Sequence, residues 1–316
     1  MSVALFTHPA ALAHDTGYEH PECAERIRAV LRALEAPEFS TLLREVAPQA
    51  TTAQLKAVHD PDYVDAIFAM PRDRETVIDG DTVFNSGTLE AALRSAGGAC
   101  AAVDAVFEGW AEAGFVAMRP PGHHAEIDRA MGFCFFNNAA VAALHARARW
   151  GITRVAVVDF DVHHGNGTQH MFSADPGLFY ASTHQTGSFP GTGAATERGV
   201  ANNIINVPLM PGATGEVFRG VWETQILPRL RDFAPELLII SAGFDAHAAD
   251  PLAQLRLREA DFAWVTTALL EVADATCPKR VVSLLEGGYD LNALAQSAAA
   301  HVRALMRLWF LPRPCR

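Results

Sequence analysis

Short runs of apolar and β-branched residues alternate along the chain with longer stretches in which apolar residues recur every three or four positions. The short runs predict strands and the longer stretches predict helices, because these are the side-chain periods of the two structures. The predicted strands are Val3–Phe6, Phe115–Met118, Arg154–Phe160, Leu178–Ala181, Asn203–Val207, Leu237–Ser241 and Val281–Leu285. The predicted helices are Glu22–Leu34, Gly87–Phe107, Asn137–Trp150, Gly215–Phe233, Glu259–Ala275 and Leu291–Leu308.

This alternation favours an α/β fold with a central parallel sheet of about eight strands and helices on both faces. Two of the runs, RVAVVDF and LLIISAGF, are almost continuously apolar, which is typical of strands buried on both sides. The chain has 316 residues, of which 50% are hydrophobic, enough to bury a sizeable core. We therefore expect a single domain over residues 1–316.

The charge balance narrows the range of partners. The chain carries 36 acidic and 25 basic residues, a formal net charge of -11. Such a charge repels phosphate backbones and anionic lipid surfaces, so we expect neither nucleic acid nor membrane as a partner. The high apolar content fits an interface as well as a core, and we expect a homo-oligomer.

Cysteine use and the N-terminus predict the compartment. The cysteines Cys23, Cys100, Cys134, Cys277 and Cys315 are odd in number and never form a CxxC pair, so neither a disulfide framework nor a thiolate zinc site is indicated. The segment MSVALFTHPAALAHD has no basic start, and no run of about 18 apolar residues occurs anywhere. We expect a soluble protein of the cytoplasm.

The segment VAVVDFDVHHGNG places Asp159, Asp161 and His163 at alternate positions. In an extended backbone these three side chains share one face, where a divalent cation would compensate the buried charges. Asp245 follows the next strongly apolar strand and supplies a further carboxylate. Asp161, His163 and Asp245 then form a two-carboxylate, one-imidazole set with open coordination positions, as a catalytic metal requires.

The ligand types favour zinc, although ferrous iron and cobalt accept the same donors. His247 and Asp250 lie close to Asp245 and are alternative ligands. We rank them lower because loop residues beyond a strand end are usually structural. Asp159 is one acid more than the site needs, and we assign it to orienting a histidine.

Two further segments carry proton-transfer chemistry. His123 and His124 follow a Pro-Pro-Gly turn in RPPGHHAE, and we expect these adjacent imidazoles to serve as general base and general acid. Tyr289 follows two glycines in EGGYD, where a phenol can donate a hydrogen bond to a developing oxyanion.

Together these segments resemble the histone deacetylases of the arginase/deacetylase superfamily, and within them the class II branch with its bacterial relatives. The resemblance covers nearly the whole chain. It rests on seven ordered motifs: HPECAER, VHDPDYV, RPPGHHAE, GFCFFNN, VDFDVHHGNGTQ, SAGFDAHAADPL and EGGYD.

The resemblance implies one zinc ion on Asp161, His163 and Asp245, with His124 as general base and Tyr289 as the group that polarises the scissile carbonyl. His123 would support His124 electrostatically. It further implies that Asp159 pairs with His123, and that Asn166 stands beside His124 where class I relatives carry an aspartate. An amide partner leaves that imidazole less basic. A structural potassium ion would lie against Asp159, Asp161, His163 and Ser182.

For the substrate, the resemblance implies a tunnel for acyl-lysine with Phe133 and Phe189 as walls and the Gly132 carbonyl as an acceptor. Arg26 would line a channel for acetate release. Arginases of the same superfamily bind two manganese ions through a further DxD pair, and Gly243-Phe244-Asp245-Ala246-His247 has one acid only.

Relatives divide between acetylated lysine in proteins and acetylated polyamines. Polyamine specialists carry a glutamate seven residues after the third ligand, and this chain has Leu252 there. We therefore expect an enzyme that removes acetyl or other acyl groups from lysine and releases acetate. An acetylpolyamine or other small-molecule amidohydrolase is the alternative, because the negative net charge attracts any cation. A non-catalytic binding module is disfavoured because every catalytic residue type is present.

Overall fold

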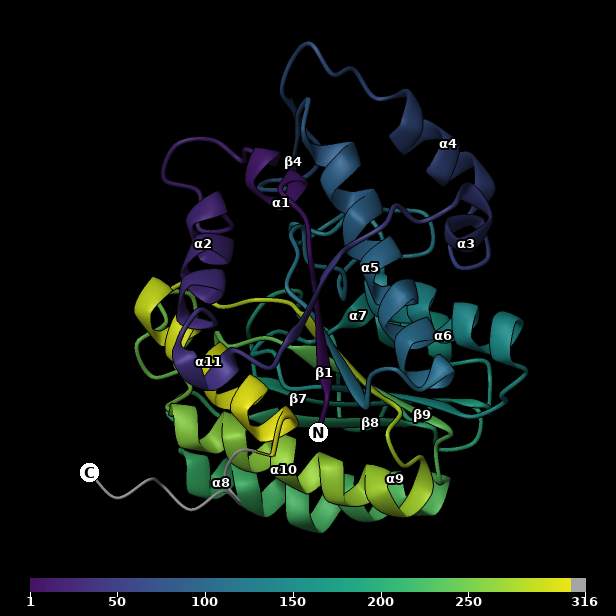
Figure 1. The fold of residues 1–316 in the computed structure, drawn as a ribbon, viewed down its shortest axis with the longest axis vertical. Helices are drawn as coiled ribbons and strands as arrows, with labels where there is room; N and C mark the ends of the chain where they lie inside the picture. The colour runs from purple at the N-terminus through teal and green to yellow at the C-terminus, as the bar shows by residue number, and fades with distance from the viewer. Residues whose placement is uncertain (308–316) are drawn as a thin grey trace.

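A computed structural model describes residues 1–307, and its centre is an eight-stranded sheet in which every pairing is parallel (Figure 1). The strand order is β2-β1-β5-β10-β9-β6-β7-β8. The strands are β1 (Val3–Thr7), β2 (Leu43–Val46), β5 (Ala113–Val116), β6 (Val155–Asp159), β7 (Leu178–Gln185), β8 (Ile204–Leu209), β9 (Leu237–Ala242) and β10 (Val281–Leu285). A separate antiparallel pair consists of β3 (Thr76–Val77) and β4 (Val83–Phe84). The predicted parallel α/β sheet is confirmed.

Of the predicted strands, only β10 has its predicted limits at both ends, and the differences in β5, β6 and β7 bear on the site. β5 ends at Val116, two residues before the predicted end, whereas β7 continues to Gln185 because its polar residues 182–184 are buried like the apolar ones before them. β6 ends at Asp159, so the prediction that the extended strand runs through Phe160 is wrong. The edge strand β2 was not predicted.

Helices alternate with the strands along the chain. They are α1 (Ala10–Ala13), α2 (Ala24–Ala33), α3 (Thr52–Lys56), α4 (Pro61–Ala69), α5 (Thr88–Glu108), α6 (Asn138–Trp150), α7 (Asn166–Phe172), α8 (Gly215–Val221), α9 (Leu227–Phe233), α10 (Glu259–Thr276) and α11 (Leu291–Leu305). A 3₁₀ turn covers Pro37–Phe39. The predicted helix over Gly215–Phe233 is continuous in space but contains a π-helical segment at Trp222–Ile226.

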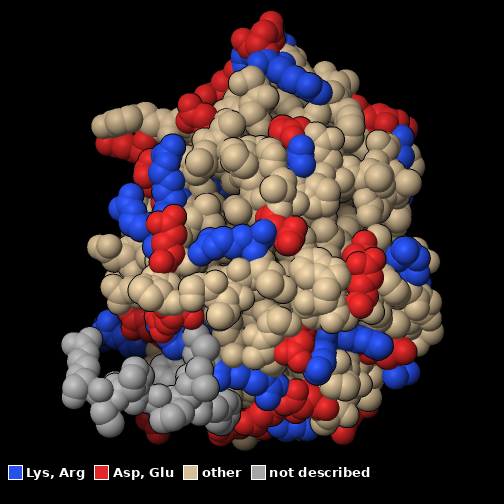
Figure 2. Space-filling model, in the orientation of Figure 1, with Lys and Arg blue, Asp and Glu red and all other residues tan. Residues whose placement is uncertain are grey.

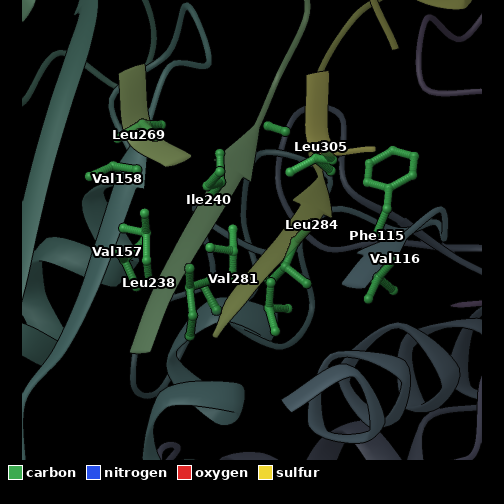
Figure 3. Close-up of a cluster of buried hydrophobic side chains, with 14 of the residues drawn as sticks. Phe115, Val116, Val157, Val158, Leu238, Ile240, Leu269, Val281, Leu284 and Leu305 are labelled. Carbon is green, nitrogen blue, oxygen red and sulfur yellow. The ribbon is translucent and has the colours of Figure 1, made fainter. Parts of the chain in front are cut away.

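The long helices α5 and α6 cover one face of the sheet, and α10 and α11 cover the other (Figure 1). Figure 3 shows how side chains of neighbouring central strands, among them Val157, Leu238 and Val281, gather in the core. All three are at most 1% exposed. His301 of α11 also packs inward, and its two ring nitrogens bond Thr266 and Ser283. Helices on both faces are thus confirmed.

The strand order brings distant loops to one edge. Strands β9 and β10, which come last along the chain, lie between β5 and β6. Because all strands are parallel, the loops after β5, β6, β7, β9 and β10 leave from the same edge of the sheet. Open α/β sheets bind ligands at this edge, next to the point where the strand order reverses.

The surface and the cysteines add two observations. Acidic and basic side chains are intermixed over the face shown in Figure 2. Within the described part of the chain, no helix is long and apolar enough to cross a membrane. Cys23, Cys100, Cys134 and Cys277 are free thiols, and Cys315 lies outside the described residues.

Candidate active site

Two carboxylates and an imidazole meet at the carboxyl edge of the sheet. Nδ1 of His163 lies 3.1 Å from Oδ1 of Asp161 and 3.1 Å from Oδ2 of Asp245. All three residues are buried, and their potential ligand atoms lie within 4.8 Å of one another. Within residues 1–307 this is the one group of His, Cys, Asp and Glu side chains arranged to hold a metal ion.

The backbone around this trio is bent rather than extended. After β6 ends, the N–H of Asp161 bonds Oδ1 of Asp159 at 3.1 Å, and the N–H of His163 bonds Oδ1 of Asp161 at 2.8 Å. Aspartate side chains that capture backbone N–H groups in this way turn a chain out of a strand. The three residues face one centre because of these bends, and the prediction of a shared strand face is corrected accordingly.

Glycines directly after β9 and β10 allow the close approach. A Cβ on Gly243 would overlap Asp161, and a Cβ on Gly287 would overlap both Asp161 and Asp245. The N–H of Gly287 also donates to Oδ2 of Asp161 at 2.8 Å, and the N–H of Val162 donates to Oδ1 of Asp245 at 2.9 Å. The carboxylates are therefore held in place by backbone donors.

The donor set fits a divalent cation. Although burial opposes a charged imidazole, Asp161 and Asp245 outweigh it and raise the pKa of His163 to about 10. A site that attracts a proton so strongly carries uncompensated negative charge, which a metal ion can neutralise in its place. Asp161, His163 and Asp245 are the residues that would hold such an ion.

His123 is paired with Asp159 beside the trio. Its Nδ1 lies 2.9 Å from Oδ2 of Asp159, which also accepts a hydrogen bond from the hydroxyl of Tyr180 at 3.1 Å. Burial opposes the imidazolium, but Asp159 and Asp161 together raise the pKa of His123 to about 10. His123 is thus held by a carboxylate that favours its protonated form.

His124 is the neutral member of the pair, and its ring centre lies 4.0 Å from that of His123. Burial, with the positive charges of His123 and His163, lowers the pKa of His124 well below its usual value. Its Nδ1 lies 2.8 Å from Oδ1 of Asn166. Since an amide oxygen only accepts, Nδ1 carries the proton and Nε2 has a free lone pair.

Glu286 supports the histidine pair, a role that the sequence did not reveal. One oxygen of its buried carboxyl group accepts the N–H of Gly122 at 2.7 Å and that of His123 at 3.2 Å. The other accepts the hydroxyl of Ser241 at 3.1 Å. Burial raises the pKa of Glu286 to about 7, although His123 and the N–H of Gly122 oppose the shift.

Tyr289 belongs to the loop that follows β10. Its N–H donates to Oδ2 of Asp250 at 2.7 Å, so Asp250 anchors this loop and does not join the metal-type trio. His247 is likewise outside the trio, and its Nδ1 accepts the N–H of Ala249. Burial raises the pKa of the Tyr289 hydroxyl well above 10, which keeps the phenol protonated as a donor.

Arg26 connects Tyr289 to a buried ion-pair network. Its guanidinium lies 4.9 Å from the Tyr289 ring centre and donates to the carbonyls of Gly288 at 2.6 Å and Glu286 at 2.5 Å. It also pairs with Glu22 at 2.9 Å. The guanidinium of Arg26 therefore packs against the face of the Tyr289 ring.

A pocket of about 260 Å³ opens onto His163 and Tyr289. The remaining residues that line it are Asp81, Gly132, Phe133, Ser188, Phe189 and Leu252. The ring of Phe189 lies 4.9 Å from that of His124, and the ring of Phe133 lies 6.0 Å from that of Tyr289. Gly132, Phe133, Phe189 and Leu252 were named from the sequence, whereas Asp81 was missed because the sequence predicts no strand or motif around the turn between β3 and β4.

Ser182, named for a potassium site, lies opposite Asp159 in the pairing of β7 with β6. Its hydroxyl lies 2.9 Å from Nδ1 of His184. The potassium site itself stays a prediction.

The carboxyl edge of this parallel sheet thus carries a buried Asp-His-Asp trio that could hold a metal ion, with a histidine pair beside it. A model of the histone deacetylase domain matches residues 20–305. The chain therefore belongs to the histone deacetylase family, as its motifs predict.

Individual relatives agree with this assignment. The chain is 38% identical to Histone deacetylase 14, chloroplastic, of Arabidopsis thaliana, over 96% of this chain and 76% of that protein. It is 38% identical to a histone deacetylase-like amidohydrolase of Pseudomonas aeruginosa, over 89% and 74% of the two chains. A crystal structure of the HDA15 HD domain superposes with a TM-score of 0.92 at 34% identity, covering 97% of this chain and 90% of that one. The arginase/deacetylase fold is thereby confirmed.

Proposed function

We propose that this protein is a zinc-dependent amidohydrolase that removes acetyl groups from the ε-amine of lysine in peptides or proteins. The observation that carries the proposal is the convergence of three features at one pocket. These are the Asp161–His163–Asp245 trio, whose His163 lines the pocket, and the protonated phenol of Tyr289, which lines it too. The third is the neutral imidazole of His124, which packs against the pocket wall at Phe189. Zinc suits the mixed oxygen and nitrogen donors, and ferrous iron or cobalt are the substitutes.

A divalent ion at the trio would lower the pKa of a water molecule and polarise the amide carbonyl. His124 accepts a proton at Nε2 as the water oxygen attacks the carbonyl carbon. Tyr289 donates a hydrogen bond to the carbonyl oxygen as negative charge develops there. The C–N bond then breaks, and the proton held on the histidine pair passes to the departing amine. Acetate and a free amine result.

His123 and its partners support these steps. With its positive charge, which Asp159 stabilises, His123 lowers the pKa of His124 and keeps that ring neutral before the reaction. Asn166 holds the His124 ring in the tautomer that leaves Nε2 free. Asp159, His123 and Asn166 thus orient His124 and adjust its pKa. All of these residues are buried.

The pocket mouth favours acyl-lysine as the substrate. Leu252 is 40% exposed there and supplies no charge to pair with a distal amine. Phe133 and Phe189 provide aromatic walls for an alkyl chain. The exposed carboxylate of Asp81 and the net charge of -11 attract cations of either kind, so acetylpolyamines are the second candidate.

The test compares the catalytic efficiency of the purified enzyme on an acetyl-lysine peptide with that on N-acetylputrescine and acetylspermidine. We expect the peptide to be preferred, and Leu252→Glu to shift the preference towards the polyamines. A preference of about tenfold or more for the polyamines in the unmodified enzyme would contradict the acyl-lysine assignment. The expected homo-oligomer is tested separately, since light scattering that shows a monomer at micromolar concentration would rule it out.

A further inference from the structure

A second carboxylate lies behind the amide that contacts His124. Nδ2 of Asn166 donates to Oε1 of Glu126 at 2.6 Å. The other oxygen of Glu126 lies 2.6 Å from Nδ1 of His170. A hydrogen-bonded chain therefore runs from His124 through Asn166 and Glu126 to His170, whose side chain is 59% exposed at the surface.

The direction of this chain depends on Glu126. The oxygen and nitrogen of an amide exchange places by a half-turn, so the partners of Asn166 decide which atom faces His124. A carboxylate only accepts, and it therefore holds the NH₂ group of Asn166 on its own side. The weaker contacts of that group, with the His124 carbonyl at 3.3 Å and Met131 sulfur at 3.5 Å, act in the same sense.

The orientation of the amide decides whether His124 can act as a base. With Oδ1 of Asn166 towards the ring, Nδ1 of His124 is the protonated nitrogen and Nε2 is free. With NH₂ towards the ring, Nδ1 must accept and the proton moves to Nε2. A neutral imidazole protonated at Nε2 cannot take a proton from water at that atom.

Glu126 is itself firmly held. Its side chain is 12% exposed. Its carbonyl lies 2.9 Å from Nδ1 of the buried His59, whose other nitrogen accepts the N–H of Asn137 at 2.9 Å. His59 thereby ties the backbone of Glu126 to the start of α6, while His170 and Asn166 hold the carboxylate.

We propose that Glu126 is a positioning residue that orients the Asn166 amide and so keeps His124 in the tautomer with Nε2 free. The inference rests on the proposed function in taking His124 as the base. It assigns Glu126 no contact with substrate or metal.

Three variants separate this role from a general structural one. Glu126→Met keeps the approximate volume but removes the acceptor, and we expect kcat to fall about tenfold, equal to about 1.4 kcal/mol, with KM unchanged within about twofold. Glu126→Gln retains an acceptor oxygen and should keep most of the activity. Adding Asn166→Asp to Glu126→Met should restore kcat, because an aspartate accepts from Nδ1 of His124 in either orientation. Asp128→Asn, at an exposed position in the same loop, is the matched control.

A spectroscopic reading reports the tautomer without any substrate. In the ¹⁵N–¹H correlation spectrum of the metal-loaded protein, the His124 ring, assigned by its loss in His124→Ala, should show a protonated Nδ1. In Glu126→Met a population protonated at Nε2 should appear, and Asn166→Asp should remove it. Glu126→Ala provides the same reading if the methionine variant does not fold.

The outcomes separate the two proposals. An unchanged kcat and an unchanged His124 signal in Glu126→Met would overturn the role of Glu126. The same conclusion follows if the double variant is less active than Glu126→Met alone. A protein that shows the expected tautomers but hydrolyses no acylated amine would instead refute the proposed function and leave the role of Glu126 standing.

Discussion

The buried carboxylate of Glu22 pairs with two buried arginines, and its replacement by glutamine is expected to destabilise the fold. Glu22 is 0% exposed and bonds Arg119 at 2.5 and 2.7 Å and Arg26 at 2.9 Å. Both guanidinium groups are also 0% exposed. Glutamine keeps the shape of the side chain but leaves two buried cations without a counter-charge.

The size of the effect follows from the pKa of Glu22. Burial opposes ionisation, but Arg119 and Arg26 outweigh it and lower the pKa of Glu22 from 4.5 to about 2. The ionised carboxylate thus contributes about 3 kcal/mol to stability, fully present above pH 4.5 and lost as the pH falls towards 2. Removing one partner of a buried ion pair costs about 3–5 kcal/mol, which is the same range.

Urea unfolding of the wild type and Glu22→Gln at pH 7, followed by circular dichroism, measures this difference. We expect the free energy of unfolding to fall by about 3 kcal/mol. The matched control is Glu25→Gln, three residues along the chain, where the carboxylate is 56% exposed and pairs with the exposed Arg28. That variant should lie within about 0.5 kcal/mol of the wild type. Equal losses in both variants, or no loss in Glu22→Gln, would refute the reasoning.

Three further predictions concern acid stability and the pocket. Burial lowers the pKa of His301 to about 3, so its contribution to stability is complete above pH 6.5 and is lost as the pH falls towards 3. Between pH 4.5 and 6, the unfolding free energy of His301→Gln should therefore depend on pH less steeply than that of the wild type, by about one proton; equal slopes would contradict this. Asp250→Asn should lower kcat about tenfold, because both carboxylate oxygens of Asp250 accept backbone N–H groups. If Asp250 acts through Tyr289, the double variant with Tyr289→Phe should be little slower than Tyr289→Phe alone, and multiplied losses in kcat would exclude that role. Gly132→Ala places a Cβ 2.6 Å from the His124 ring and should abolish peptide turnover. The control Gly191→Ala is also at a positive φ, but its Cβ would have no neighbour within 4 Å, so this variant should stay active. Equal activities of the two variants would show that the clash is absent.

The sequence predicted those parts of the fold that depend on local periodicity. The run Val281–Leu285 coincides with β10, because its apolar residues leave no ambiguity about a strand buried on both faces. The edge strand β2, Leu43–Val46, was missed because all four of its residues are exposed and two are charged. It is a strand only because β1 offers it hydrogen bonds, which no local pattern records.

In the candidate site, too, the sequence predicted one part and missed another. Motif spacing brought out Asp161, His163 and Asp245, and the structure gathers them into one trio. The partners that orient the site are distant in sequence: Glu286 bonds Gly122 across 164 positions. Contacts of this kind arise from the strand order. The motif around Glu286 therefore does not reveal which distant backbone N–H groups its carboxylate will accept.

The central claim is metal-dependent amide hydrolysis by one ion per chain at the Asp161–His163–Asp245 trio. The most direct test adds zinc stepwise to metal-free protein and measures acetate released from an acetyl-lysine peptide. The account predicts that activity rises from none to a plateau at one equivalent of zinc, and that His163→Ala stays inactive throughout. Acetate release by the metal-free protein, or a plateau that requires two equivalents, would contradict it.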